Sequence, residues 1–210
     1  MKALIGRKLG MTQIFGERGK TQAVTLLQAG PCVVTQVKTA DKDGYIAVQL
    51  GFGEAKKLSK PATGHLKSSQ AKSRYLREFR VQPAADDADT SGELKVGDKL
   101  DASQFEVGDE VTIVGISRGK GFAGTIKRHN FSRGPKTHGS MSYRRPGSIG
   151  SMYPQKVFKG QKMSGRMGND RVTLQKVKIA EVKPEEQLLA IAGPVPGPRK
   201  GLVLIEASNG

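Results

Sequence analysis

The chain has 210 residues, which allows one domain, or one domain with a sizeable extension, and a hydrophobic core of useful size. It carries 35 Lys and Arg against 19 Asp and Glu, a formal net charge of +16 at pH 7, which predicts a polyanionic partner. No run of about 18 apolar residues is present, and charges return too soon after Met1 for a signal peptide. The sequence therefore predicts a cytoplasmic protein that makes no contact with a membrane.

Short strands are expected through the first 52 residues. Residues 4–15 predict one or two strands broken at Gly10 and Gly16, and residues 23–27 predict another that ends at Gly30. Residues 33–39 and 46–52 predict an antiparallel pair joined by a turn in which Gly44 supplies a positive φ. The lone Cys32 cannot form an intrachain disulfide, and its apolar surroundings predict a buried strand residue.

Between residues 53 and 95 the alternation of apolar and polar residues becomes less regular. Residues 69–81 fit a helix with Ala71, Tyr75 and Phe79 on one face, and a strand over 76–81 fits almost equally well. The acidic stretch 84–90 predicts a solvated loop. The similar phrases 95–100 and 106–111 each place Gly-Asp at a turn, and the second leads into a strand over 111–116.

After residue 171 the strand signals return. Residues 172–179 change phase, which predicts a β-bulge near Gln175 and Lys176, and two further strands are expected over 188–192 and 202–206. In total about eight to ten short strands with turns between them predict a mainly β protein with a small closed or partly closed barrel.

The segment 118–171 differs sharply from its flanks. It holds thirteen Lys or Arg and a single acid, Asp170, so it supplies +12 of the net charge, and it holds ten of the 27 glycines. A segment of this composition has too few apolar residues to form a hydrophobic core of its own, but its positive charge favours binding to a polyanion. We therefore predict a β-barrel body formed by residues 1–117 and 172–210, with a less regular insertion at 53–95, and a basic Gly-rich extension at 118–171 that is anchored between two neighbouring strands.

Phosphate binding explains the motifs of the extension better than catalysis does. Residues 119–124 read G-x-G-x-x-G, but no second strand with a terminal acid follows, as a dinucleotide site requires. The three histidines lack metal-ligand spacing, and no acid lies between Glu110 and Asp170 to orient a base. The sequence therefore predicts no enzyme activity, no catalytic residue, no metal site, no cofactor and no small-molecule substrate.

Aromatic side chains are interleaved with the bases of the extension. Flat rings and flexible methionines can pack on unstacked bases, which favours irregular RNA over a regular duplex. Tyr143 and Tyr153 are candidate contacts, whereas Phe122, Phe131 and Phe158 could equally form a minor core where the extension begins. The Gly and Pro residues around 146–150 exclude a regular helix or strand there.

Several long phrases resemble one family closely. They are residues 6–15 (GRKLGMTQIF), 119–131 (GKGFAGTIKRHNF), 137–140 (THGS), 145–150 (RPGSIG) and 157–173 (VFKGQKMSGRMGNDRVT). Together they are similar to the bacterial type of large-subunit ribosomal protein three, and the resemblance spans nearly the whole chain.

The resemblance implies a translation-protein-type β-barrel with a long irregular basic extension inserted between strands. It implies binding to large-subunit rRNA of the 23S type, early subunit assembly, contacts with neighbouring ribosomal proteins, and an extension whose residues 147–152 approach the peptidyl transferase centre. The RNA-binding residues expected from the charges, the aromatic positions and the resemblance are Arg7, Lys8, Arg118, Lys120, Lys127, Arg128, His129, Arg133, Lys136, His138, Tyr143, Arg144, Arg145, Ser151, Tyr153, Lys156, Lys159, Lys162, Arg166 and Arg171.

Two positions depart from the family pattern. Ser151 stands where many bacterial relatives have a Gln, N-methylated in some, and His129 stands where a Trp is common. The modification is therefore expected to be absent, and a smaller ring replaces the indole. From composition alone, a general RNA chaperone or an architectural nucleic-acid-binding protein is the alternative, and a nucleotide-dependent enzyme using residues 119–124 is a third hypothesis.

Overall fold

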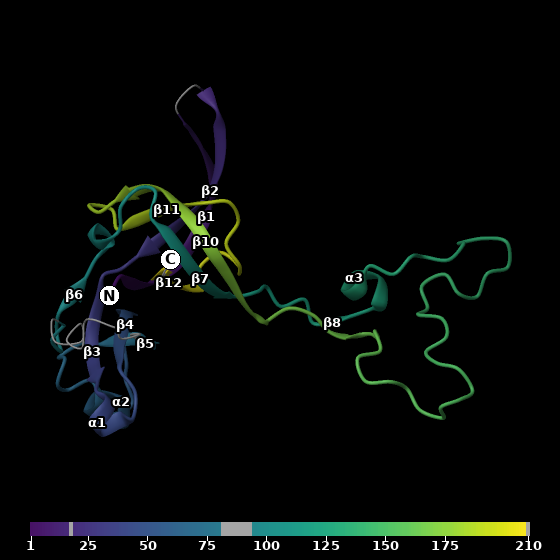
Figure 1. The fold of residues 1–210 in the computed structure, drawn as a ribbon, viewed down its shortest axis with the longest axis horizontal. Coiled ribbons are helices and arrows are strands. Elements are labelled where there is room, and N and C mark those ends of the chain that lie inside the picture. Colours follow the sequence, from purple (N-terminus) through teal and green to yellow (C-terminus); the bar gives the residue numbers. More distant parts are fainter. Residues whose placement is uncertain (17–18, 81–93, 209–210) are drawn as a thin grey trace. The chain divides into compact units, whose positions relative to one another are not determined.

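A computed structural model describes residues 1–16, 19–80 and 94–208, and most of the regular structure is β-strand (Figure 1). The elements in chain order are β1 (Ala3–Phe15), β2 (Thr21–Ala29), β3 (Cys32–Lys38), α1 (Ala40–Asp43), β4 (Ala47–Glu54), α2 (Lys60–His65), β5 (Ser73–Arg80), β6 (Lys99–Leu100), the 3-10 helix η2 (Ala102–Gln104), β7 (Glu110–Ile116), β8 (Phe122–Ala123), α3 (Thr125–His129), β9 (Gly165–Arg166), β10 (Arg171–Lys183), β11 (Leu188–Ala192) and β12 (Leu202–Ala207). The predicted mainly β class is confirmed.

Six strands form a ring of antiparallel pairs. Their hydrogen-bonded order is β1-β12-β7-β10-β11-β2, and β2 pairs back onto β1, so each strand has a neighbour on both sides. Within the ring each strand therefore pairs along both of its edges, and no strand of the ring is an edge strand. The strands β1 and β2 continue past the ring as a hairpin, in which residues 10–15 of β1 pair only with β2 (Figure 1).

A four-stranded sheet in the order β5-β4-β3-β6 packs on the ring through a shared core. Leu4, Ile113 and Ile205 from the ring and Leu50 and Phe79 from the sheet are at most 2% exposed and belong to one hydrophobic cluster. Because burial of each such side chain stabilises the fold by about 1.5 to 3 kcal/mol, this common core holds the ring and the sheet together.

Cys32 lies inside this core, at the start of β3. Its side chain has no exposed surface, and its sulfur lies 3.4 Å from both the N and the O of Ile5. Burial raises the pKa of the Cys32 thiol to about 12, an effect to which the nearby Asp101 carboxylate adds and which the hydrogen bond from Ile5 opposes. The predicted buried strand cysteine is confirmed.

The glycines and turns behave largely as expected. Gly44 has φ +78° and follows the single helical turn α1 between the antiparallel strands β3 and β4. Gly97 and Gly108 have φ +102° and +97°, and in both turns the following Asp carboxylate accepts a hydrogen bond from the backbone N–H three residues earlier. The shared phrases therefore encode the same turn twice.

Two expectations were less accurate, and a third lies on residues that the structure does not describe. Gly10 does not break the first strand, because β1 absorbs it as a register shift between Lys8 and Gly10. Residues 73–80 form the strand β5 and no helix, which agrees with the strand alternative, because pairing with β4 outweighs the helical spacing of the apolar residues. The acidic stretch 84–90 lies outside the described residues.

The last strands agree closely with those predicted from the sequence. The register between β7 and β10 shifts between Leu174 and Val177, with Lys176 at φ +54°, which is the predicted bulge. The strand β11 occupies residues 188–192 as expected, and Ile116 pairs with Arg171. The two ends of the basic segment therefore leave the ring side by side.

Residues 117–170 form one compact unit, and residues 1–116 with 171–210 form another.

Candidate nucleic-acid interface

The two legs of the extension are joined near its beginning and end by backbone hydrogen bonds. The N–H of Ser117 donates to the O of Asp170 at 2.8 Å, and Lys120 and Gly121 exchange bonds with Met167. The strands β8 and β9 then form a short antiparallel pair. This ladder brings the first and last residues of a 54-residue insert together. The glycine-rich backbone between these two ends can therefore follow an irregular path.

A second set of contacts fixes the helix α3 against the returning leg. The guanidinium of Arg128 and the ring Nε2 of His129 each lie 3.0 Å from the carbonyl oxygen of Met163. Since a carbonyl only accepts, the Nε2 of His129 carries the hydrogen. A Cβ on Gly165 would lie 2.5 Å from Arg128 Nη1, so a side chain at this position would displace the guanidinium from its place beside Met163.

Beyond α3 the chain forms no regular element until β9. Residues 134–143 close a loop in which the N–H of Gly134 donates to the O of Tyr143 at 3.1 Å. Nearer the middle, the Ser151 hydroxyl donates to the O of Tyr153 at 2.7 Å. The prediction that Gly and Pro exclude helix and strand around 146–150 is confirmed.

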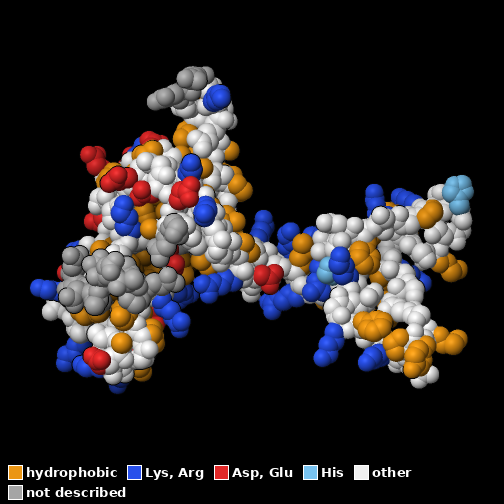
Figure 2. All heavy atoms as spheres, in the orientation of Figure 1, with side chains coloured by type: hydrophobic (Ala, Val, Ile, Leu, Met, Phe, Trp, Pro, Cys, Tyr) orange, Lys and Arg blue, Asp and Glu red, His pale blue; other side chains and the backbone are white. Residues whose placement is uncertain are grey.

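The thirteen bases of residues 118–171 are all exposed. Twelve lie in the unit 117–170, where Asp170 is the single acid, so little within the unit neutralises them. Figure 2 shows Lys and Arg side chains along this unit, interspersed with hydrophobic ones. Exposed, like-charged side chains at this density create a positive potential that attracts a polyanion.

The large apolar side chains of the extension are mostly exposed as well. Met152 is 91% exposed, Tyr153 84%, Phe122 80% and Phe158 59%. The two phenylalanines therefore belong to no local core, which decides the alternative that the sequence left open for them. Phe131 differs, because it is half-buried and its ring centroid lies 6.1 Å from that of His129.

Arg7 and Lys8, the two residues of the body that were expected to bind RNA, lie in different environments. Arg7 is half-buried on β1. Lys8 is buried, and its ammonium donates to the carbonyls of Val195 and Gly197 at 2.6 and 3.3 Å. Burial lowers the pKa of Lys8. The structure thus places the Lys8 charge inside the protein, where it holds the loop between β11 and β12; the sequence offers no signal of this, because the two carbonyls are almost 190 residues away.

The motif 119–124 has no dinucleotide-binding architecture around it. It leads into the two-residue strand β8 and the five-residue helix α3, and β8 pairs antiparallel with β9. A Rossmann unit needs a parallel strand and a full crossover helix. Within residues 1–16, 19–80 and 94–208, no three His, Cys, Asp or Glu side chains are grouped to hold a metal, and no helix is long and apolar enough to cross a membrane.

Comparison with known proteins identifies the family of this chain. The family model of ribosomal protein L3 matches residues 53–191. This chain belongs to the ribosomal protein L3 family. The match covers the whole extension together with strands β5 to β10 and most of β11.

Individual relatives match over almost their entire length. The large ribosomal subunit protein uL3 of Heliobacterium modesticaldum is 54% identical over 210 residues, covering 99% of this chain and 97% of the relative. The uL3 proteins of Carboxydothermus hydrogenoformans and Syntrophobacter fumaroxidans are 51% and 48% identical, with coverage of at least 96% on both sides. The L3 family membership inferred from the motifs of this chain is confirmed.

Proposed function

We propose that this chain is a structural, non-enzymatic component of the large ribosomal subunit and binds large-subunit rRNA of the 23S type through residues 118–171. The observation that carries the proposal is the set of thirteen exposed bases on a segment with one acid and almost no regular structure. Phosphate neutralisation by Lys and Arg supplies most of the affinity in such complexes. Membership of the L3 family and the names of its relatives support the ribosomal setting.

RNA fits the exposed apolar groups better than duplex DNA does. Tyr153 and Met152 are almost fully exposed, and unstacked bases and riboses of folded RNA offer flat apolar surfaces for them. Because the backbone of residues 134–160 forms no regular element, it can follow an irregular groove between RNA helices.

The proposed contacts fall into two groups. Arg128 and His129 contact the Met163 carbonyl and act as positioning residues for the returning leg, while the other bases of the extension are exposed and available to a partner. The proposed phosphate and base contacts are Arg118, Lys120, Lys127, Arg133, Lys136, His138, Tyr143, Arg144, Arg145, Ser151, Tyr153, Lys156, Lys159, Lys162, Arg166 and Arg171.

Family membership supports the finer parts of the proposal. Residues 147–152 would be the part of the extension nearest the peptidyl transferase centre, and the body would contact neighbouring ribosomal proteins in the cytoplasmic ribosome. Chemistry at that centre would belong to the RNA, so the protein would shape the site and support early assembly of the subunit.

The test compares the intact protein on folded large-subunit rRNA and on a random RNA of the same length, over a series of salt concentrations. We expect a clear preference for the folded rRNA, and comigration of the protein with large-subunit particles. Equal affinity for the two RNAs, without comigration, would instead support a general RNA chaperone.

Replacing the exposed Lys159 by Gln should remove one phosphate contact. We expect the slope of log K against log salt concentration for rRNA binding to flatten by about one unit, because each contact contributes roughly 0.7 to 0.9. The measurement is a salt titration of both proteins, with Lys183→Gln on β10 as the matched control. A slope equal to that of the unmodified protein would exclude a phosphate contact at Lys159.

A further inference from the structure

The charge of the body is divided unevenly along the sequence. Residues 54–80 carry eight Lys or Arg against two acids, whereas residues 81–117 carry two against nine. The positive charge of the first segment and the negative charge of the second nearly cancel when the charge of the whole body is summed. All eight bases of residues 54–80 are exposed. A second strongly basic segment therefore exists outside the extension.

Few acids within the described part of the chain balance this segment. Of its own two acids, Glu78 is already engaged, because its carboxylate lies 2.9 Å from the Lys38 ammonium and accepts a hydrogen bond from the Tyr45 hydroxyl. This pairing lowers the pKa of Glu78 and keeps it ionised next to Lys38. Among the described residues, no carboxylate lies within ion-pair distance of any of the eight bases.

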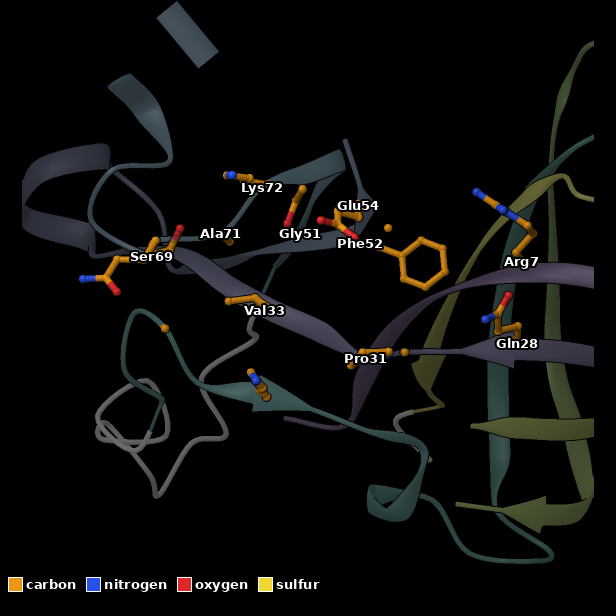
Figure 3. A pocket seen from close by; sticks show the side chains of 16 residues that line it. Arg7, Gln28, Pro31, Val33, Gly51, Phe52, Glu54, Ser69, Ala71 and Lys72 are labelled. Atoms are coloured by element: carbon orange, nitrogen blue, oxygen red, sulfur yellow. The ribbon is translucent and has the colours of Figure 1, made fainter. Parts of the chain in front are cut away.

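The segment borders a cleft of about 700 Å³ in the body. The bases on its lining are Arg7 from β1, Lys72 just before β5, and Lys99 from β6, and one acid, Glu54, is present. Figure 3 shows Arg7 on the side of the ring strands and Lys72 on the side of the four-stranded sheet. Three bases from distant parts of the sequence thus surround one hollow with a net charge of +2.

Glycines keep the backbone of the cleft open. Gly30, Gly51 and Gly53 all line it, and Gly30 and Gly53 have φ +85° and +69°. A side chain at Gly51 would collide with Ser73, so glycine is required there for β4 and β5 to pair closely. Backbone without side chains allows a sugar-phosphate strand to approach closely.

From this arrangement we infer a second RNA-binding site, in which the sugar-phosphate backbone of an RNA strand lies in the cleft between Arg7, Lys72 and Lys99. Glu54 favours this ligand over a small free anion, because a carboxylate repels an anion but accepts a hydrogen bond from a ribose 2′-hydroxyl. The inference rests on the proposed function and adds to it a contact on the body, independent of the extension.

The test uses the full chain carrying Lys72→Gln and Lys99→Gln together. Both residues are exposed, so folding is retained, and the slope of log K against log salt for rRNA should flatten by about 1.4 to 1.8. At 0.1 M salt this corresponds to a loss of affinity of roughly 25- to 60-fold. The matched control is Lys178→Gln with Lys183→Gln, which removes the same charge from exposed positions on β10 and should change affinity much less.

A second measurement needs no variant. The rates at which a small acylating reagent modifies Lys72 and Lys99 in the intact protein should fall when rRNA binds, while those of Lys178 and Lys183 should not. If the intact protein prefers folded rRNA but the cleft variant matches the control and Lys72 stays reactive, the inference is overturned and the basic surface fits an acidic protein partner. If the intact protein shows no preference for rRNA, the proposed function itself fails.

Discussion

Replacing residues 134–160 with a short Gly-Ser linker is expected to lower affinity for folded large-subunit rRNA roughly a thousandfold or more at 0.1 M salt. The segment carries five exposed bases, Lys136, Arg144, Arg145, Lys156 and Lys159, so the slope of log K against log salt should fall by about 3.5 to 4.5. The contacts near the start of the extension, between Arg128 and Met163 and between β8 and β9, remain in this variant. The measurement is equilibrium binding over a salt series.

A shuffled segment provides the matched control for this deletion. A chain in which residues 134–160 keep their composition but change their order should retain most of the salt dependence and lose the preference for folded rRNA over random RNA. This outcome separates the charge of the segment from the placement of its aromatic and basic side chains. An unchanged affinity after the deletion would falsify the proposal that the extension carries much of the binding.

Stability is expected to fall at alkaline pH because of Cys32. The pKa of its thiol is raised from 9.0 to about 12, so the neutral form is favoured in the folded state. The stabilisation is fully present below about pH 9 and is lost as pH rises toward 12, since the unfolded chain then releases a proton that the folded chain retains. Between pH 8 and pH 11 the loss should be about 3 kcal/mol in the free energy of unfolding.

The comparison that isolates this thiol uses Cys32→Ala. The free energy of unfolding of both proteins is measured in urea at pH 8 and pH 11. Lysines and tyrosines titrate in both chains, so their contribution cancels in the difference between the two proteins. The alanine protein should be less stable at pH 8, because a small cavity replaces the sulfur, and should lose less stability on going to pH 11. Equal losses in both proteins would show that the thiol is not buried as the structure places it.

The sequence alone was sufficient for the class of fold and for the position of the basic segment. Alternating apolar residues predicted strands such as 188–192, the change of phase predicted the bulge at Lys176, and the separation of charge located the extension. These are local properties, because the period of a strand and the φ of a turn glycine depend on residues close in sequence. The motifs likewise sufficed to identify the family, which the relatives confirmed.

Only the tertiary structure decided which charged and apolar side chains are available to a partner. Lys8 and Arg7 are adjacent on β1, yet Lys8 is buried against the loop at 195–197 while Arg7 lines a cleft with Lys72 and Lys99. Phe122 and Phe131 lie in the same phrase, and one is exposed while the other packs near His129. Pairings between strands far apart in the sequence set these environments, and the spacing of residues along the chain holds no information about such neighbours.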